Sequence, residues 1–181
     1  PEGGEDTKYL IFFNYLVRHK WYVFLECCRY GIPFLGILHD ISKFLPGEFI
    51  AYANYYQNQV SGQYRGSQAL EPTLAWLKHQ KRNRHHWQWW ILHGDDNSPR
   101  VLPMPEKYVK EMVADWRGAG LAQGQADTLA WYHANKHKII LHPATRSQVE
   151  QLLYNSRITD SLDRINESAA AVNCRYYFQG L

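Results

Sequence analysis

The sequence is poor in cysteine and has no long hydrophobic run. Its three cysteines include the adjacent pair Cys27 and Cys28, which cannot easily bridge each other, so we expect no disulfide framework. No stretch of about 18 consecutive apolar residues occurs. The start of the chain is acidic and Gly-rich rather than basic and then apolar. Because neither a membrane span nor a signal peptide is indicated, we expect a reduced, cytoplasmic protein without a membrane partner.

A large excess of one charge is also missing. The chain has 20 Lys and Arg against 17 Asp and Glu, which gives a formal net charge of +3. Proteins whose main partner is nucleic acid usually carry a clustered positive excess. Nucleic acid is therefore not the favoured partner, whereas a small anionic substrate is compatible with this charge.

Strand-like alternation is absent, and helical spacing dominates. At 181 residues with 45% hydrophobic content, the chain is long enough for one well-buried core. Apolar residues recur at three- and four-residue steps, which predicts helices at residues 9–30, 34–42, 48–58, 73–92, 107–118, 125–137 and 145–153. The predicted fold is an all-α, single-domain bundle of about six to eight helices.

Three segments are expected along the chain. Residues 1–8 are predicted to be a flexible N-terminal segment, residues 9–155 the helical domain, and residues 156–181 a C-terminal extension. The tail from Tyr177 to Leu181 resembles the recognition sequence of a protease used to remove purification tags. Because part of the extension could derive from a tag, its last dozen residues carry no weight in the fold prediction.

Four residues suggest a metal site. His19, the pair His39-Asp40 and Asp115 lie far apart on separate predicted helices. Imidazole and carboxylate groups together suit divalent Mn, Fe, Co, Ni and Zn. No single loop can bring these residues together, so the fold must direct several helices toward one ion.

A second cluster runs from Lys78 to Trp87 and contains three histidines, four cations and an asparagine. Its candidate metal ligands are His79, His85 and His86, and its candidate contacts to a substrate phosphate are Arg82, Asn83 and Arg84. In a continuous helix His79 and His86 share a face, whereas His85 points about 100° away from His86, so those two neighbours are not expected to bind the same ion. Alternatively, this basic segment beside aromatic residues contacts nucleic acid or a membrane surface.

The order His19, His39-Asp40, Asp115 resembles the H…HD…D signature of the HD-domain superfamily of metal-dependent phosphohydrolases. The segments 38–44, 83–87 and 104–116 are similar to an uncharacterised family of small bacterial and phage proteins of HD type, and the likeness covers about residues 9–153. The resemblance implies that His19, His39, Asp40 and Asp115 bind one divalent ion. The additional histidines are similar to those of the two-metal HD branch, which contains cyclic-dinucleotide phosphodiesterases and diiron oxygenases. The Gly-Tyr-Pro element of the former is absent after His86.

The resemblance also implies a reaction. One or two divalent ions would activate water against the phosphate ester of a nucleotide or another small phosphorylated compound. Asp40 would bridge the ions if there are two, Lys43 would bind the substrate phosphate, and Glu48 is a candidate acid or base. The alternatives are an HD-type diiron oxygenase and a non-catalytic binding module that a metal stabilises.

Overall fold

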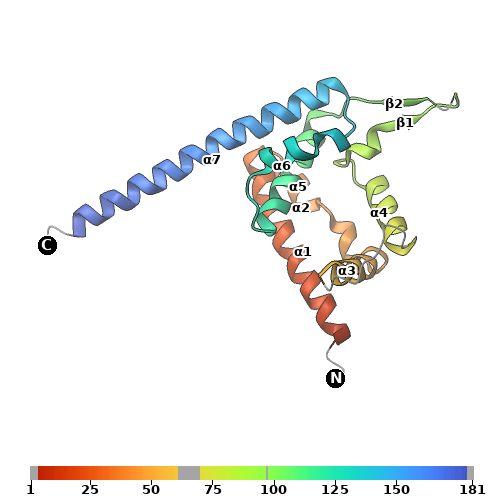
Figure 1. The fold of residues 1–181 in the computed structure, drawn as a ribbon, viewed down its shortest axis with the longest axis horizontal. Coiled ribbons are helices and arrows are strands. Elements are labelled where there is room, and N and C mark those ends of the chain that lie inside the picture. The colour runs from red at the N-terminus through yellow and green to blue at the C-terminus, as the bar shows by residue number, and fades with distance from the viewer. Residues whose placement is uncertain (1–3, 61–69, 97, 179–181) are drawn as a thin grey trace.

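The computed structural model describes residues 4–60, 70–96 and 98–178, with side chains for residues 7–56, 70–96 and 98–161. Seven α-helices occur in these residues (Figure 1), namely α1 (Gly4–Arg29), α2 (Pro33–Leu38), α3 (Pro46–Val60), α4 (Leu70–Arg82), α5 (Glu106–Ala122), α6 (Thr128–Asn135) and α7 (Pro143–Phe178). Three short 3-10 segments, η1 (Ile41–Phe44), η2 (Trp87–Trp90) and η3 (Lys136–Lys138), connect them. The prediction of an all-α bundle is confirmed.

Three apolar clusters in the described residues hold the helices together. The largest joins α5, α6 and α7 and contains Met104, Val109, Met112, Val113, Tyr132, Ile139, Leu141, Val149 and Leu153. A second joins α1 to α3 through Phe12, Leu16 and Ala53, and a third joins α1 to α5 through Val23, Cys27 and Ala114. Between the clusters, α1 packs along α5, and α3 packs against α4 (Figure 1). This arrangement places one face each of α1, α4 and α5 around a common centre.

A glycine sets the separation of α1 and α5. A Cβ atom added to Gly118 would lie 2.5 Å from Val23 Cγ2 and 2.7 Å from the Val23 backbone nitrogen. Both distances are shorter than real Cβ contacts, so only glycine allows this approach. Since His19 lies one turn before Val23 and Asp115 one turn before Gly118, the close approach also brings these two side chains together.

The first and last helices extend across the predicted segment boundaries. Helix α1 already begins at Gly4, because acidic residues at positions 5 and 6 favour the positive end of the helix dipole. At the other end, α7 continues past residue 155 without a break and extends away from the body (Figure 1). Arg117 donates to Glu26 Oε2 at 2.6 Å and to Asp160 Oδ2 at 2.9 Å, which fixes α7 against α1 and α5 beyond the predicted end of the domain.

The predicted helix over residues 73–92 is also too long. Helix α4 ends at Arg82, and a small antiparallel hairpin follows, in which β1 (Ile91–His93) pairs with β2 (Pro99–Val101). Asp96 Oδ1 accepts hydrogen bonds from the backbone nitrogen and the hydroxyl group of Ser98. These bonds close the hairpin turn. At the end of α4, Asn83 Nδ2 donates to the carbonyl oxygen of His79, and this bond competes with continuation of the helix.

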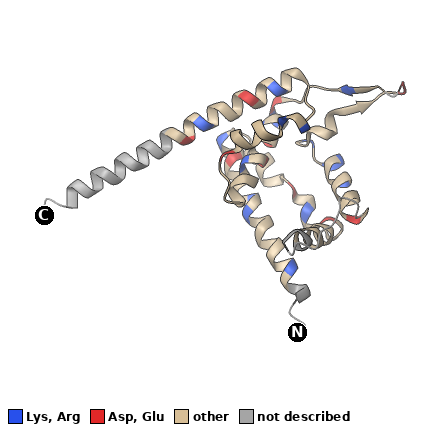
Figure 2. Cartoon of the chain, in the orientation of Figure 1, with Lys and Arg blue, Asp and Glu red and all other residues tan. Residues whose placement is uncertain are grey.

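Charged residues of both signs are distributed over the chain. Along the part of α7 whose side chains are described, basic and acidic residues alternate (Figure 2). Within the described residues, no helix combines the length and the apolar character that crossing a membrane requires.

We expect Gly118→Ala to lower the free energy of unfolding by about 1–3 kcal/mol, because the added methyl group collides with the backbone of α1. Urea denaturation followed by circular dichroism measures this change. Gly47→Ala is the matched control, since a Cβ atom there has no neighbour within 4 Å. Equal stability of the Gly118 variant and the unmodified protein would contradict the close packing of α1 and α5.

Candidate metal centre

The His39-Asp40 pair lies in a tight turn after α2. Asp40 has a φ of 53°, a left-handed conformation that Asp tolerates better than most residues. Lys20 Nζ on α1 donates to the carbonyl oxygens of Ile37 and His39, both at 2.7 Å. These bonds satisfy carbonyl groups at the end of α2 and hold the turn against α1. As a result, the side chains of His39 and Asp40 point inward, and each residue is 1% exposed.

The first group of candidate ligands is the predicted H…HD…D set. His19 Nε2 lies 3.3 Å from Asp115 Oδ1 and 3.7 Å from Asp40 Oδ2. His39 Nε2 lies 3.4 Å from the same two oxygens. One ligand atom from each of these four residues lies within 4.8 Å of the others, a spacing that could hold one metal ion.

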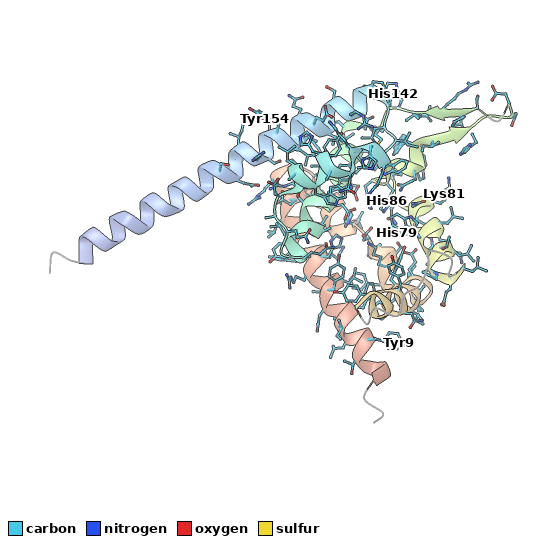
Figure 3. All side chains as sticks on the ribbon, viewed as in Figure 1. Tyr9, His79, Lys81, His86, His142 and Tyr154 are labelled. Carbon is cyan, nitrogen blue, oxygen red and sulfur yellow. The ribbon has the colours of Figure 1, made fainter. Side chains whose placement is uncertain are left out.

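A second group consists of Asp40, His79, His85 and His86, whose ligand atoms also lie within 4.8 Å of one another. The sequence-based argument that His85 and His86 point to different sites is wrong, because α4 ends before them. The turn is closed by hydrogen bonds from Asn83 N to His79 O and from His86 N to Asn83 O. Figure 3 shows His79 and His86 near the middle of the molecule, whereas His142 lies apart from them near the start of α7.

Asp40 belongs to both groups, and each of its oxygens faces one of them. Oδ1 lies 3.2 Å from His79 Nε2 and 3.4 Å from His85 Nε2. Oδ2 faces the Nε2 atoms of His19 and His39. A carboxylate in this position is able to bridge two metal ions, one beside each group of histidines.

The hydrogen bonding of the buried nitrogen atoms indicates whether these residues fit a metal ion. The Nε2 atoms of all five histidines are buried and form no hydrogen bond. Leaving a buried polar atom unpaired costs about 1–3 kcal/mol. Burial and the neighbouring His85 lower the pKa of His86 to about 2, so this imidazole is neutral, which is the form that binds metals. Five unpaired nitrogens around two carboxylates fit divalent cations.

Carboxylates behind the histidines orient the rings. Glu111 Oε1 lies 3.2 Å from Nδ1 of both His39 and His85, and Glu48 Oε2 lies 3.0 Å from Nδ1 of His79. Donation from Nδ1 to a carboxylate fixes a metal-binding histidine with Nε2 free to ligate. Sequence reasoning missed Glu111. Its signal was its position four residues before Asp115, because residues four apart share one face of a helix.

Glu48, the predicted acid or base, is buried among protein partners. Its Oε2 also accepts a hydrogen bond from Ser42 Oγ at 2.9 Å, and its Oε1 accepts one from Arg82 at 2.7 Å. The residue is 2% exposed. Both carboxylate oxygens therefore contact other side chains of the protein.

The three predicted phosphate contacts in residues 82–84 are likewise engaged with the protein. Arg82 pairs with Glu48, and Asn83 Nδ2 donates to the carbonyl oxygen of His79 at 2.9 Å. The guanidinium group of Arg84 lies 5.2 Å from the centre of the Trp89 ring and makes no contact with a candidate ligand among the described residues. Arg82 and Asn83 therefore support His79, and none of the three is placed as a phosphate contact.

Lys43 lies at the edge of the centre. Its Nζ is 2.6 Å from Asp40 Oδ2. Burial alone would lower the pKa of Lys43, but the charges of Asp40 and Asp115 outweigh burial and raise this pKa, so the ammonium group stays protonated. The side chains of Lys43 and Asp115 are 20% and 16% exposed, whereas those of His19, His39, His79 and His85 are at most 4% exposed. Lys43 and Asp115 are therefore more open to solvent than these four histidines.

The model of the family of unknown function DUF5662 matches residues 8–155. The chain belongs to this family. No curated protein and no solved structure matches the chain. All the candidate ligands and the carboxylates behind them lie within the matched residues.

We expect Glu111→Gln to weaken metal binding by about 10–100-fold, because the uncharged amide holds His39 and His85 less firmly. Titration of the metal-free protein with Mn²⁺ or Zn²⁺ measures the affinity. Glu106→Gln on the same helix is the control, since the side chain of Glu106 is 68% exposed. Equal affinities of the two variants would remove Glu111 from the metal centre.

Proposed function

We propose that the protein is a metal-dependent phosphohydrolase of HD type that cleaves the phosphate ester of a nucleotide or another small phosphorylated compound. The observation that carries this proposal is the position of Asp40, whose two oxygens face two separate groups of histidines. The order His19, His39-Asp40, Asp115 supports membership of the HD superfamily. The additional histidines support a centre for two ions.

The donor set favours hydrolysis. Five imidazoles and two carboxylates suit divalent Mn, Fe, Co, Ni or Zn, and the protein is proposed to bind two such ions per chain. Bound divalent ions lower the pKa of water toward neutrality and polarise a phosphoryl oxygen. The carboxylates are charged at neutral pH, because attraction to nearby histidines outweighs burial and keeps the pKa values of Asp40 and Asp115 well below their usual range.

Two side chains of the protein would bind the substrate. Lys43 brings a protonated ammonium group to the open edge, where it would neutralise charge on a phosphate. The hydroxyl group of Tyr52 is buried without a hydrogen-bond partner, and its ring lies 5.9 Å from Lys43 Nζ. Burial and the nearby Glu48 raise the pKa of Tyr52, so its hydroxyl stays neutral and is able to donate to a substrate oxygen.

The second candidate function is an HD-type diiron oxygenase. The observation in its favour is that histidines outnumber carboxylates around Asp40, since imidazole is a good ligand for iron. A non-catalytic binding module is less well supported. Of the basic residues 78–84 that it would use, Arg82 is paired with Glu48 and Arg84 packs on Trp89.

Metal analysis of single variants tests the two-ion centre. We expect about two ions per chain in the unmodified protein, about one in Asp115→Ala, about one in His79→Ala, and none in Asp40→Asn, because only Asp40 belongs to both groups. Elemental analysis gives these ratios, and circular dichroism checks that helix content is unchanged. His93→Ala is the control, since His93 lies in β1 outside both groups. Unchanged metal content in Asp115→Ala would refute the assignment of the first group.

Measuring turnover and metal content in the same variant separates a role in substrate binding from a role in metal binding. We expect Lys43→Ala to reduce hydrolysis of phosphate esters by about 10–100-fold and to keep its metal, because a hydrogen bond from a charged group contributes about 1.5–3 kcal/mol. Lys81→Ala, an exposed lysine on α4, is the control. Loss of metal from Lys43→Ala in proportion to the loss of activity would contradict this division of roles.

Iron content and oxygen dependence distinguish hydrolase from oxygenase. Hydrolysis of a panel of nucleotides and sugar phosphates, equal in air and under anaerobic conditions, is the expected result. Two bound irons per chain, together with activity that disappears without oxygen, would favour the oxygenase over the hydrolase as the function of the protein.

A further inference from the structure

An unusual amount of apolar surface lies outside the metal centre. Eight large apolar side chains, here called the apolar face, are Phe13, Val17, Trp21, Phe34, Ile37, Leu38, Ile41 and Leu45. Those of α1 follow one another at four-residue steps. On α1 this spacing places the three side chains on one side of the helix. The other five are exposed on α2, on η1 and directly after η1.

The two sets lie side by side. Lys20 Nζ, between Val17 and Trp21 on α1, binds the carbonyl oxygens of Ile37 and His39. The Phe13 ring packs edge-on against Phe44, with ring centroids 6.3 Å apart. Helix α1 therefore runs along α2 and η1, and the apolar side chains of the three segments form one surface.

The apolar face is large enough for a protein interface. Phe34 is 79% exposed, Leu38 and Ile41 are each 59% exposed, and Trp21 is 57% exposed. If a fully exposed side chain of this kind presents about 150–200 Å², the apolar face presents roughly 800 Å². The largest apolar patch on a typical monomer is about 300–600 Å². A stable interface buries about 800 Å² on each partner, so the apolar face matches a dimer rather than a monomer.

Charge argues for an identical partner. The only charged residues between Pro33 and Leu45 are Asp40 and Lys43, and these are paired at 2.6 Å and directed to the metal centre. Residues 33–45 thus offer no free charge that could pair with an oppositely charged protein or with lipid headgroups. On the α1 part of the apolar face, Lys20 is bound to backbone carbonyl oxygens, and Arg18 is the exposed charge beside Val17. In a two-fold dimer the same patch meets itself, so an uncharged apolar surface is complementary to its own copy.

We propose that the apolar face is the two-fold interface of a homodimer. Leu38 and Ile41, at the middle of this interface, directly flank His39 and Asp40. The second copy covers the outer side of the left-handed turn at Asp40, while the candidate ligands cover its inner side. Dimerisation therefore stabilises the turn that positions the shared carboxylate, and this link is independent of the reaction that the centre catalyses.

Sedimentation velocity and light scattering of the purified chain test the interface. We expect a mass of twice 21.3 kDa for the unmodified protein. Phe34→Asp should raise the dimer dissociation constant at least tenfold, because it places a charge on each side of the two-fold axis. The acidic residue suits the first turn of α2, so circular dichroism should show unchanged helix content. Leu77→Asp, on an exposed and apolar position of α4, is the matched control and should remain dimeric.

Three results would overturn the proposal. The first is a monomeric unmodified protein, and the second is a dimer that Phe34→Asp does not weaken. The third is a monomer that co-sediments with phosphatidylcholine and phosphatidylglycerol vesicles, which would assign the apolar face to a membrane surface. The link to the metal centre has its own readout. Phe34→Asp should lose metal to a chelator faster than Leu77→Asp, and equal rates would show that the interface does not support the turn at Asp40.

Discussion

The buried carboxylate of Asp40 is the group on which the rest of the structure depends. It is 1% exposed, and five histidine Nε2 atoms and Asp115 lie around it. An ionised group in this position is very costly unless cations and hydrogen-bond donors surround it. Lys43 supplies one positive charge, and the unpaired histidine nitrogens supply the ligands for further cations. The packing of α1, α4 and α5 serves to bring these groups to one carboxylate.

The metal centre is built in layers. The ligand nitrogens face Asp40, Glu111 and Glu48 hold the opposite nitrogens of three rings, and Ser42 and Arg82 hold Glu48 in turn. Each layer restricts the side chains of the layer inside it, so the candidate ligands are held in fixed orientations. Lys43 and Asp115, at the edge of the candidate centre, are partly exposed and carry opposite charges. The apolar face lies directly behind the same turn, so the outer surface and the centre constrain one short segment from both sides.

The sequence predicted which residues the fold brings together more fully than it predicted their surroundings. The six other residues predicted to bind metal lie around Asp40, and they could be named without the distances between helices because the ligand chemistry belongs to the histidine and aspartate side chains themselves. The predicted helix ran through residue 92, so the prediction placed His85 and His86 on different faces. This was incorrect because hydrogen bonds within the turn after Arg82 end the helix. Arg82 was predicted to contact the substrate phosphate and Glu48 to act as an acid or base, because the ion pair between them joins two segments and could not be known from the sequence.

Apolar periodicity and side-chain chemistry are local properties, so they are enough to predict the helical architecture and the identity of the candidate ligands. The packing of the helices decided that Asp40 turns one oxygen to each group of histidines and that Glu111 contacts two rings. It also decided that the apolar residues from Phe34 to Leu45 remain outside the core. These features depend on how closely helices approach, as at Gly118 and Val23, and that separation results from packing between residues about a hundred positions apart.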